Sequence, residues 1–169
     1  MIREVEGDIL SSEAQLIAHG IATHDPFDSG LALALRERFP SMVRDYRHAM
    51  HSKHPRTGEI WSWHGVGEDG RTHGIVNLLT QGMQSQDKAA RPIKANLEDV
   101  NQALRALARL VRDEGVRSLA LPRLATGVGG LDWADVKPLI HQHLGDLDIT
   151  VLIYEVYRKD QKADEKLAA

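Results

Sequence analysis

Apolar and polar residues alternate along the chain with two different periods, one typical of strands and one of helices. Short apolar or alternating stretches that end at turn residues predict strands, and two of these form a pair joined by the polar turn 67–71. The predicted strands cover residues 1–8, 15–20, 58–66, 72–80, 116–122 and 148–156.

Between these strands, apolar residues recur every three or four positions, which is the helical period. From Leu31 this pattern runs to Met50, and Pro40 divides it into two helices. Further helices are predicted within residues 93–115 and over residues 133–143. Strands alternate with helices through most of the chain, so we predict a three-layer α/β/α sandwich with a mixed, largely parallel central sheet.

The length and composition predict one domain with a charged tail. The chain has 169 residues, of which 42% are hydrophobic, enough for a sizeable core. Residues 1–156 are assigned to the domain. Residues 157–169, which end in KDQKADEKLAA, are expected to be poorly ordered because their charge leaves little apolar surface to bury.

The charge balance narrows the range of partners. Lys and Arg number 21 against 24 Asp and Glu, a net charge of -3, so no overall positive excess points to nucleic acid or to a membrane. Without cysteine there are no disulfides or thiolate metal sites, which fits a reducing cytoplasm. The chain contains no apolar run that could cross a bilayer. We therefore expect a soluble, cytoplasmic protein without a membrane partner. Its oligomeric state is left open.

A glycine-rich loop follows the strand predicted at 116–122. The stretch LPRLATGVGGLDW, residues 121–133, joins that strand to a helix, and this is the position where open α/β sheets bind ligands. Its three glycines allow positive φ angles and a close approach of N–H groups to an anion, which suits a phosphate or pyrophosphate. In the simpler interpretation the glycines only make the turn, and Asp132 caps the helix. The spacing matches neither a P-loop nor the dinucleotide fingerprint.

A second strand-to-helix loop lies in HGIATHDPFDSGLALAL, residues 19–35, and is expected to face the same crevice. His19, His24, Asp25 and Asp28 place acids and bases there, which suits ribose hydroxyls and proton transfer. The alternative is that Asp28 and Ser29 only cap the next helix. No metal site is expected, because no second cluster or helical HxxxH spacing supports these side chains.

Four ordered motifs resemble the macrodomains, which bind ADP-ribose. They are GDIL at 7–10, IAHG at 17–20, DSGLA at 28–32 and LPRLATGVGGLDWADVKPLI at 121–140, and the resemblance covers residues 1 to about 156. The last motif is the most specific. It is similar to the sub-branch that contains glutamate-linked ADP-ribosyl protein hydrolases and antitoxin macrodomains that remove ADP-ribose from DNA.

The resemblance implies a set of ligand contacts. Asp8 accepts a hydrogen bond from the adenine amino group, with the N–H of Ile9 beside it, and Tyr154 lies against the adenine. The residues implied along the diphosphate and distal ribose are His19, Ser29, Gly30, Leu31, Thr126, Gly127, Val128, Gly129 and Gly130. In the simpler interpretation Asp8 only ends a turn, and Tyr154 is ordinary strand packing.

The expected catalytic groups depart from the family pattern. Hydrolytic members often carry a lysine where this chain has Gln81, and some carry an aspartate where it has Gly129. Glutamine cannot form a Schiff base, so a lysine-adduct mechanism is disfavoured. The catalytic candidates are Asp28, His19 and Gln81, with Asp28 preferred as the group that orients or deprotonates a water.

The function implied is ADP-ribose binding with hydrolysis of an ADP-ribosyl linkage. The implied substrate is an ester on Asp or Glu of a protein, or a related substrate such as ADP-ribosylated nucleic acid, with protein preferred. The alternatives are a non-catalytic ADP-ribose reader, an ADP-ribose-1''-phosphate phosphatase, an O-acyl-ADP-ribose deacylase, and an unrelated α/β nucleotide binder. No cofactor is implied.

Overall fold

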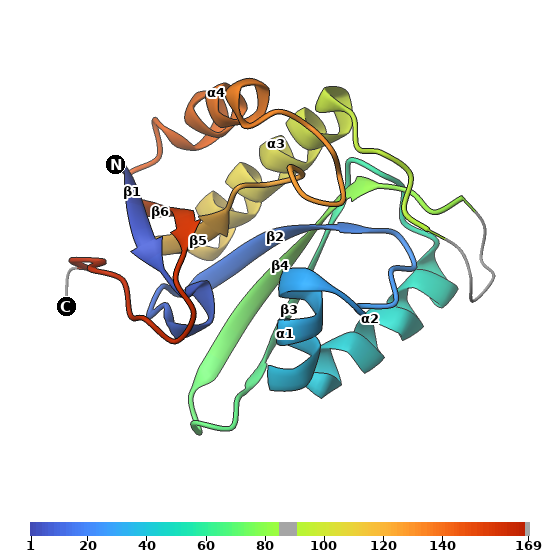
Figure 1. Cartoon of the computed structure of the whole chain (residues 1–169), viewed down its shortest axis with the longest axis horizontal. Helices are drawn as coiled ribbons and strands as arrows, with labels where there is room; N and C mark the ends of the chain where they lie inside the picture. Colours follow the sequence, from blue (N-terminus) through green and yellow to red (C-terminus); the bar gives the residue numbers. More distant parts are fainter. Residues whose placement is uncertain (85–90, 168–169) are drawn as a thin grey trace.

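The computed structural model describes residues 1–84 and 91–167, and its strands and helices alternate as the sequence predicts (Figure 1). The elements are β1 Ile2–Gly7, η1 Ile9–Ser11, β2 Leu16–Ala22, α1 Gly30–Arg38, α2 Pro40–Lys53, β3 Ile60–Val66, β4 Thr72–Gln81, α3 Leu97–Glu114, β5 Ser118–Pro122, α4 Trp133–Leu144 and β6 Thr150–Tyr157. The short 3-10 helix η1 is the element that the periodicity did not predict, because three residues are too few to show a period.

The six strands form one sheet in the order β1-β6-β5-β2-β4-β3. All neighbouring pairs are parallel except β3 and β4, which are antiparallel. Helices α3 and α4 cover one face and α1 and α2 the other (Figure 1), which confirms the α/β/α sandwich. Because β2 and β5 are parallel neighbours, the loops that follow them leave the same edge of the sheet.

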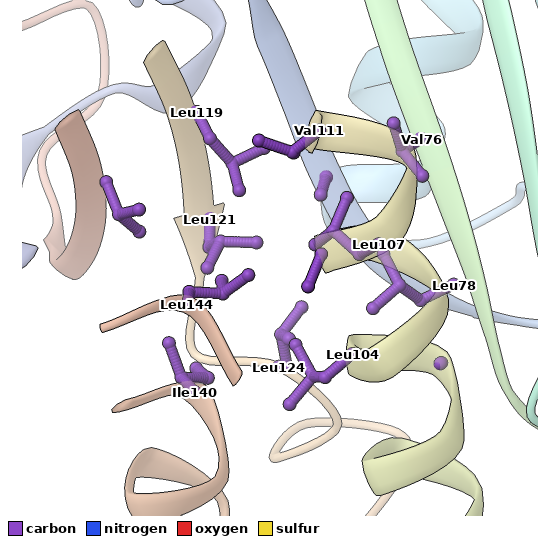
Figure 2. Close-up of a cluster of buried hydrophobic side chains, with 14 of the residues drawn as sticks. Val76, Leu78, Leu104, Leu107, Val111, Leu119, Leu121, Leu124, Ile140 and Leu144 are labelled. Atoms are coloured by element: carbon purple, nitrogen blue, oxygen red, sulfur yellow. The ribbon is translucent and has the colours of Figure 1, made fainter. Parts of the chain in front are cut away.

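The larger core lies between the sheet and the helices α3 and α4. Figure 2 shows Leu104, Leu107 and Val111 of α3 pointing between side chains of β4, β5 and α4. All three are fully or almost fully buried, as their helical spacing predicts. This packing fixes β5, and with it the start of the glycine-rich loop. No helix in residues 1–84 or 91–167 is long and apolar enough to span a membrane.

The charged C-terminal end of the chain lies against the domain. Residues 158–167 pack beside β1 and η1, where Asp160 N–H donates to Asp8 Oδ2 at 3.0 Å and Glu165 is only 7% exposed. Glu165, a buried charged residue of this segment, accepts hydrogen bonds from three donors. Residues 168–169, the end of the predicted tail, lie outside the described residues.

Candidate functional site

Two adjoining cavities lie at the edge where β2 and β5 end. We call the first, of about 440 Å³, the β1 pocket, because Gly7, Asp8 and Ile9 contribute to its wall. We call the second, of about 390 Å³, the glycine-loop pocket. Gly30, Leu31 and Pro122 line both cavities, so the two lie side by side, and we call them together the cleft.

The β1 pocket combines an apolar wall with one buried carboxylate. β1 ends at Gly7, and Asp8 then caps η1 by accepting a hydrogen bond from Leu10 N–H at 3.0 Å. Asp8 is 6% exposed and shares the pocket wall with Ile9, Leu31 and Tyr154. The structure thus brings together the residues that the resemblance assigned to one end of the ligand. An ionised carboxylate in an apolar cavity selects a ligand with a hydrogen-bond donor.

Three consecutive residues of the glycine-rich loop line its pocket. Gly127, Val128 and Gly129 line the cavity, and their N–H groups make no hydrogen bond to any residue that the structure describes. A Cβ on Gly129 would lie 2.6 Å from the carbonyl oxygen of Ala125, so this position requires glycine. Three free N–H groups in one short loop suit a diphosphate.

Two residues assigned to the same loop do not line the pocket. Thr126 donates its hydroxyl to Arg123 O at 2.9 Å. Gly130, at φ +71°, donates its N–H to Gly127 O at 3.0 Å. Both contacts lie within the loop. Thr126 and Gly130 therefore stabilise the conformation in which Gly127, Val128 and Gly129 line the pocket.

His19 lines the glycine-loop pocket as a neutral side chain. Its Nε2 lies 2.7 Å from Asn77 Oδ1, and Asn77 Nδ2 donates to Trp61 O at 3.3 Å, which fixes the orientation of the amide. His19 Nε2 therefore carries the proton, and Nδ1 is left as an acceptor. Burial lowers the pKa of His19 to about 4, partly offset by the Asn77 hydrogen bond. At neutral pH the imidazole is suited to accept a hydrogen bond and not to act as a cation.

His19 is expected to make the fold sensitive to acid. Its pKa is about 4 in the folded protein against 6.5 for a free side chain, so in that window the unfolded chain binds a proton that the folded chain does not. Stability falls as the pH falls, by about 2 kcal/mol between pH 7 and pH 5 from this group. Urea unfolding of the wild type and of His19→Gln at both pH values checks this, because the variant should lack this part of the loss. An equal loss in both proteins would contradict it.

Asp25 reaches the glycine-loop pocket, and Asp28 does not. Asp25 lines the cavity, and its Oδ1 accepts the N–H of Phe27 at 2.8 Å. Phe27 adopts φ +57° and is fully buried, with its ring 4.9 Å from that of Tyr46. Asp28 is exposed and is not among the residues that line either cavity. The loop therefore presents Asp25 to the cleft, and not Asp28, which was the preferred candidate from the sequence.

The pKa of Asp25 is raised. The main cause is burial, and the nearby negative charge of Asp28 adds to it, whereas the hydrogen bond from Phe27 N–H acts in the opposite direction. A carboxyl group with a raised pKa is a stronger base than an ordinary aspartate. A position on the wall of a cleft and a raised pKa are typical of a group that transfers protons.

Gln81 and Ser29 also line the glycine-loop pocket. Gln81, the last residue of β4, is 5% exposed, and its Oε1 accepts the hydroxyl of Thr80 at 3.3 Å. Gln81 O accepts the N–H of Thr23 at 3.0 Å, which ties the loop after β2 to β4. Among the described residues, no three metal-ligating side chains come together.

Sequence reasoning missed Asn77 and Arg123. Asn77 is fully buried in β4. A polar residue within an otherwise apolar strand pattern indicates a buried hydrogen-bond partner, and this was the available signal. Arg123 lines the glycine-loop pocket, and its guanidinium lies 5.7 Å from the ring centre of Trp133 and 3.7 Å from Glu155. Its place directly after β5 was the available signal.

Comparisons with known proteins agree with this architecture. The macro domain family model matches residues 19–140. The chain is 28% identical over 157 residues to the DNA ADP-ribosyl transferase-DNA ADP-ribosyl glycohydrolase fusion protein of Thermosipho africanus, covering 89% of this chain and 40% of the relative. It is also 28% identical over 154 residues to the DNA ADP-ribosyl glycohydrolase of Mycobacterium tuberculosis, covering 89% of this chain and 42% of that protein. The chain thus spans about two fifths of the length of these relatives.

A solved structure gives the same result for the fold. The macrodomain of Thermus aquaticus DarG superposes with a TM-score of 0.75 at 27% identity, covering 92% of this chain and 98% of that one. The family model itself includes both loops of the glycine-loop pocket. Because the match runs through most of the chain and the fold agrees, this chain belongs to the macro domain family.

Proposed function

We propose that the cleft binds ADP-ribose and that the protein hydrolyses the bond between ADP-ribose and a modified macromolecule. The adjacency of the two pockets, which share three lining residues, carries this proposal. One end offers a carboxylate and an aromatic ring to a base, the middle offers free N–H groups to a diphosphate, and the other end offers Asp25 to a ribose. The relatives named as DNA ADP-ribosyl glycohydrolases support the same chemistry.

In this proposal Asp8 accepts a hydrogen bond from the adenine amino group, and Ile9 and Tyr154 contribute to the wall around the base. Gly127, Val128 and Gly129 donate to the diphosphate. Ser29, Gly30 and Leu31 lie on the opposite side of the cleft, at the amino end of α1, whose partial positive charge favours an anion. Thr126 and Gly130 maintain the loop.

Asp25 is proposed as the general base. Its carboxylate takes a proton from a water molecule while the water oxygen bonds to the anomeric carbon of the distal ribose. The bond from that carbon to the macromolecule breaks, and its electron pair leaves with the macromolecular atom. Asp25 then returns the proton to that atom. No lysine adduct is needed, which fits a chain with Gln81 at the usual lysine position.

The catalytic candidates from the sequence, Asp28, His19 and Gln81, have supporting roles in this proposed mechanism. Asp28 contributes its charge to the raised pKa of Asp25. His19 Nδ1 accepts a hydrogen bond from a ribose hydroxyl, and Gln81 holds a hydroxyl or the attacking water through its amide. His19 and Gln81 are positioned by contacts within the fold that precede ligand binding.

The surface beside the glycine-loop pocket favours a nucleic acid as a second candidate carrier. The end of α2 and the loop after it expose five basic or titratable side chains, His48, His51, Lys53, His54 and Arg56. His24, next to Asp25 in the chain, reaches this surface with its ring 5.9 Å from that of His51. A polyanion attached to the distal ribose would lie close to the positively charged side chains of this surface. The proposed setting of either reaction is the cytoplasm.

Release of ADP-ribose tests the function. The protein is incubated separately with glutamate-modified protein, arginine-modified protein and ADP-ribosylated DNA, and free ADP-ribose is measured. Release from the glutamate ester or from DNA supports hydrolysis and identifies the carrier. Tight binding of ADP-ribose without release from any substrate would contradict hydrolysis and support the alternative of a non-catalytic reader of ADP-ribose. Absence of binding would overturn the proposal as a whole.

A further inference from the structure

The C-terminal segment, residues 158–167, lies against the β1 pocket. It follows Tyr157, which lines that pocket, and passes beside the end of β1 (Figure 1). Arg158 N–H donates to Gly7 O at 3.0 Å. A Cβ on Gly7 would lie 2.8 Å from Gln161 O, so glycine at this position allows the segment to lie this close.

This segment holds Asp8 from two sides. The N–H of Asp8 donates to Gln161 O at 2.7 Å, and the N–H of Asp160 donates to Asp8 Oδ2 at 3.0 Å. Leu10 N–H occupies the other carboxylate oxygen. Each carboxylate oxygen can accept two hydrogen bonds, so Asp8 keeps acceptor sites for a ligand while its orientation is fixed.

Glu165 anchors the segment. Its Oε2 accepts the hydroxyls of Ser12 at 2.5 Å and Tyr154 at 2.6 Å, and its Oε1 accepts the N–H of Glu13 at 2.8 Å. A carboxylate that is 7% exposed is stable only with such donors. Tyr154 lines the β1 pocket, so Glu165 holds the aromatic wall while Asp160 and Gln161 hold the carboxylate.

We infer that residues 158–167, anchored by Glu165, form a positioning element through which the β1 pocket selects a purine that carries an amino group. This inference rests on the proposed binding of ADP-ribose. An ionised carboxylate only accepts hydrogen bonds, so a correctly oriented Asp8 favours an amine and disfavours an oxo group at the same place on the ring. When the segment is released, Asp8 and Tyr154 lose the contacts that orient them, and the selectivity falls.

Calorimetric titration of the full chain tests this role. The ligands are ADP-ribose, its hypoxanthine analogue with an oxo group in place of the amine, and ribose 5-phosphate, which has no base. Glu165→Ala is expected to lower the affinity for ADP-ribose about tenfold, the value of one hydrogen bond to a charged group. The preference for ADP-ribose over the hypoxanthine analogue falls with it, and the affinity for ribose 5-phosphate is unchanged.

Two further variants complete the comparison. Glu165→Gln keeps an oxygen acceptor in place and should restore most of the preference. Lys166→Ala is the matched control, because Lys166 is exposed and its described ion pair is a surface contact with Asp164 at 3.8 Å. It should bind all three ligands like the wild type. If Glu165→Ala does not fold, Tyr154→Phe removes one of the same hydrogen bonds and should narrow the preference by a smaller factor.

The outcomes separate this inference from the proposed function. Unchanged preference in Glu165→Ala, or in Tyr154→Phe where the first variant does not fold, overturns the positioning role and leaves ADP-ribose binding intact. Equal loss of all three ligands also overturns it, since the defect would then be general. Failure of the wild type to bind ADP-ribose overturns both.

Discussion

Replacing Asp25 with asparagine is expected to slow ADP-ribose release by about 10²–10⁴-fold, the usual contribution of a general base, with little change in ADP-ribose affinity. Asparagine has the same shape, and its side-chain oxygen still accepts the N–H of Phe27, so the loop should keep its conformation. What the variant loses is the group that accepts a proton. Single-turnover release of ADP-ribose, with calorimetric titration of free ADP-ribose in parallel, measures both quantities.

Asp28→Asn is the matched control for this experiment. Asp28 lies three positions away in the same loop but is exposed and outside the cleft. Its loss removes a charge that raises the pKa of Asp25, so we expect a small change in rate and a lower apparent pKa in the pH-rate profile. A large loss in Asp28→Asn together with a normal rate in Asp25→Asn would reverse the assignment.

Replacing Gly129 with alanine is expected to weaken ADP-ribose binding on the order of a hundredfold, equivalent to losing two hydrogen bonds to a charged group. The added Cβ would lie 2.6 Å from the carbonyl oxygen of Ala125, a contact that forces the backbone to move. That movement displaces the N–H groups that line the pocket. Titration with ADP-ribose measures the loss.

Val128→Ala tests whether the effect comes from the backbone. Val128 is 65% exposed, and its shortening leaves the main chain of the loop free to keep its conformation. This variant should bind ADP-ribose nearly as the wild type does. Normal binding by Gly129→Ala would show that the loop does not deliver its N–H groups to the ligand.

The fold could be predicted from the sequence because each layer carries a local signal. Leu104, Leu107 and Val111 show the helical period of α3 directly, and Pro40 marks the start of α2. The position of the glycine-rich loop followed from the same pattern, since it begins where an apolar strand ends. Such signals depend only on residues that are close in the sequence. They were sufficient to predict the edge of the sheet at which the cleft lies.

Which of Asp25 and Asp28 lines the cleft could not be predicted in this way. It depends on the turn at Phe27, whose positive φ and complete burial are set by packing against Tyr46, a residue of another element. The packing of the C-terminal segment against the domain depends similarly on the contact between Glu165 and Ser12, which lie 153 positions apart. Both features depend on contacts between different elements of the fold, which the periodicity of apolar residues along the chain does not reveal.

The buried ring of Phe27 has a thermodynamic consequence for ligand binding. Because this side chain is part of the hydrophobic core, the loop that carries Asp25 loses its conformational freedom when the protein folds. ADP-ribose would then meet a wall that is already in place, and association would carry little of the entropic penalty associated with ordering a loop. Packing defects around Tyr46 would restore that penalty and weaken the complex from a distance, without touching any group that contacts the ligand.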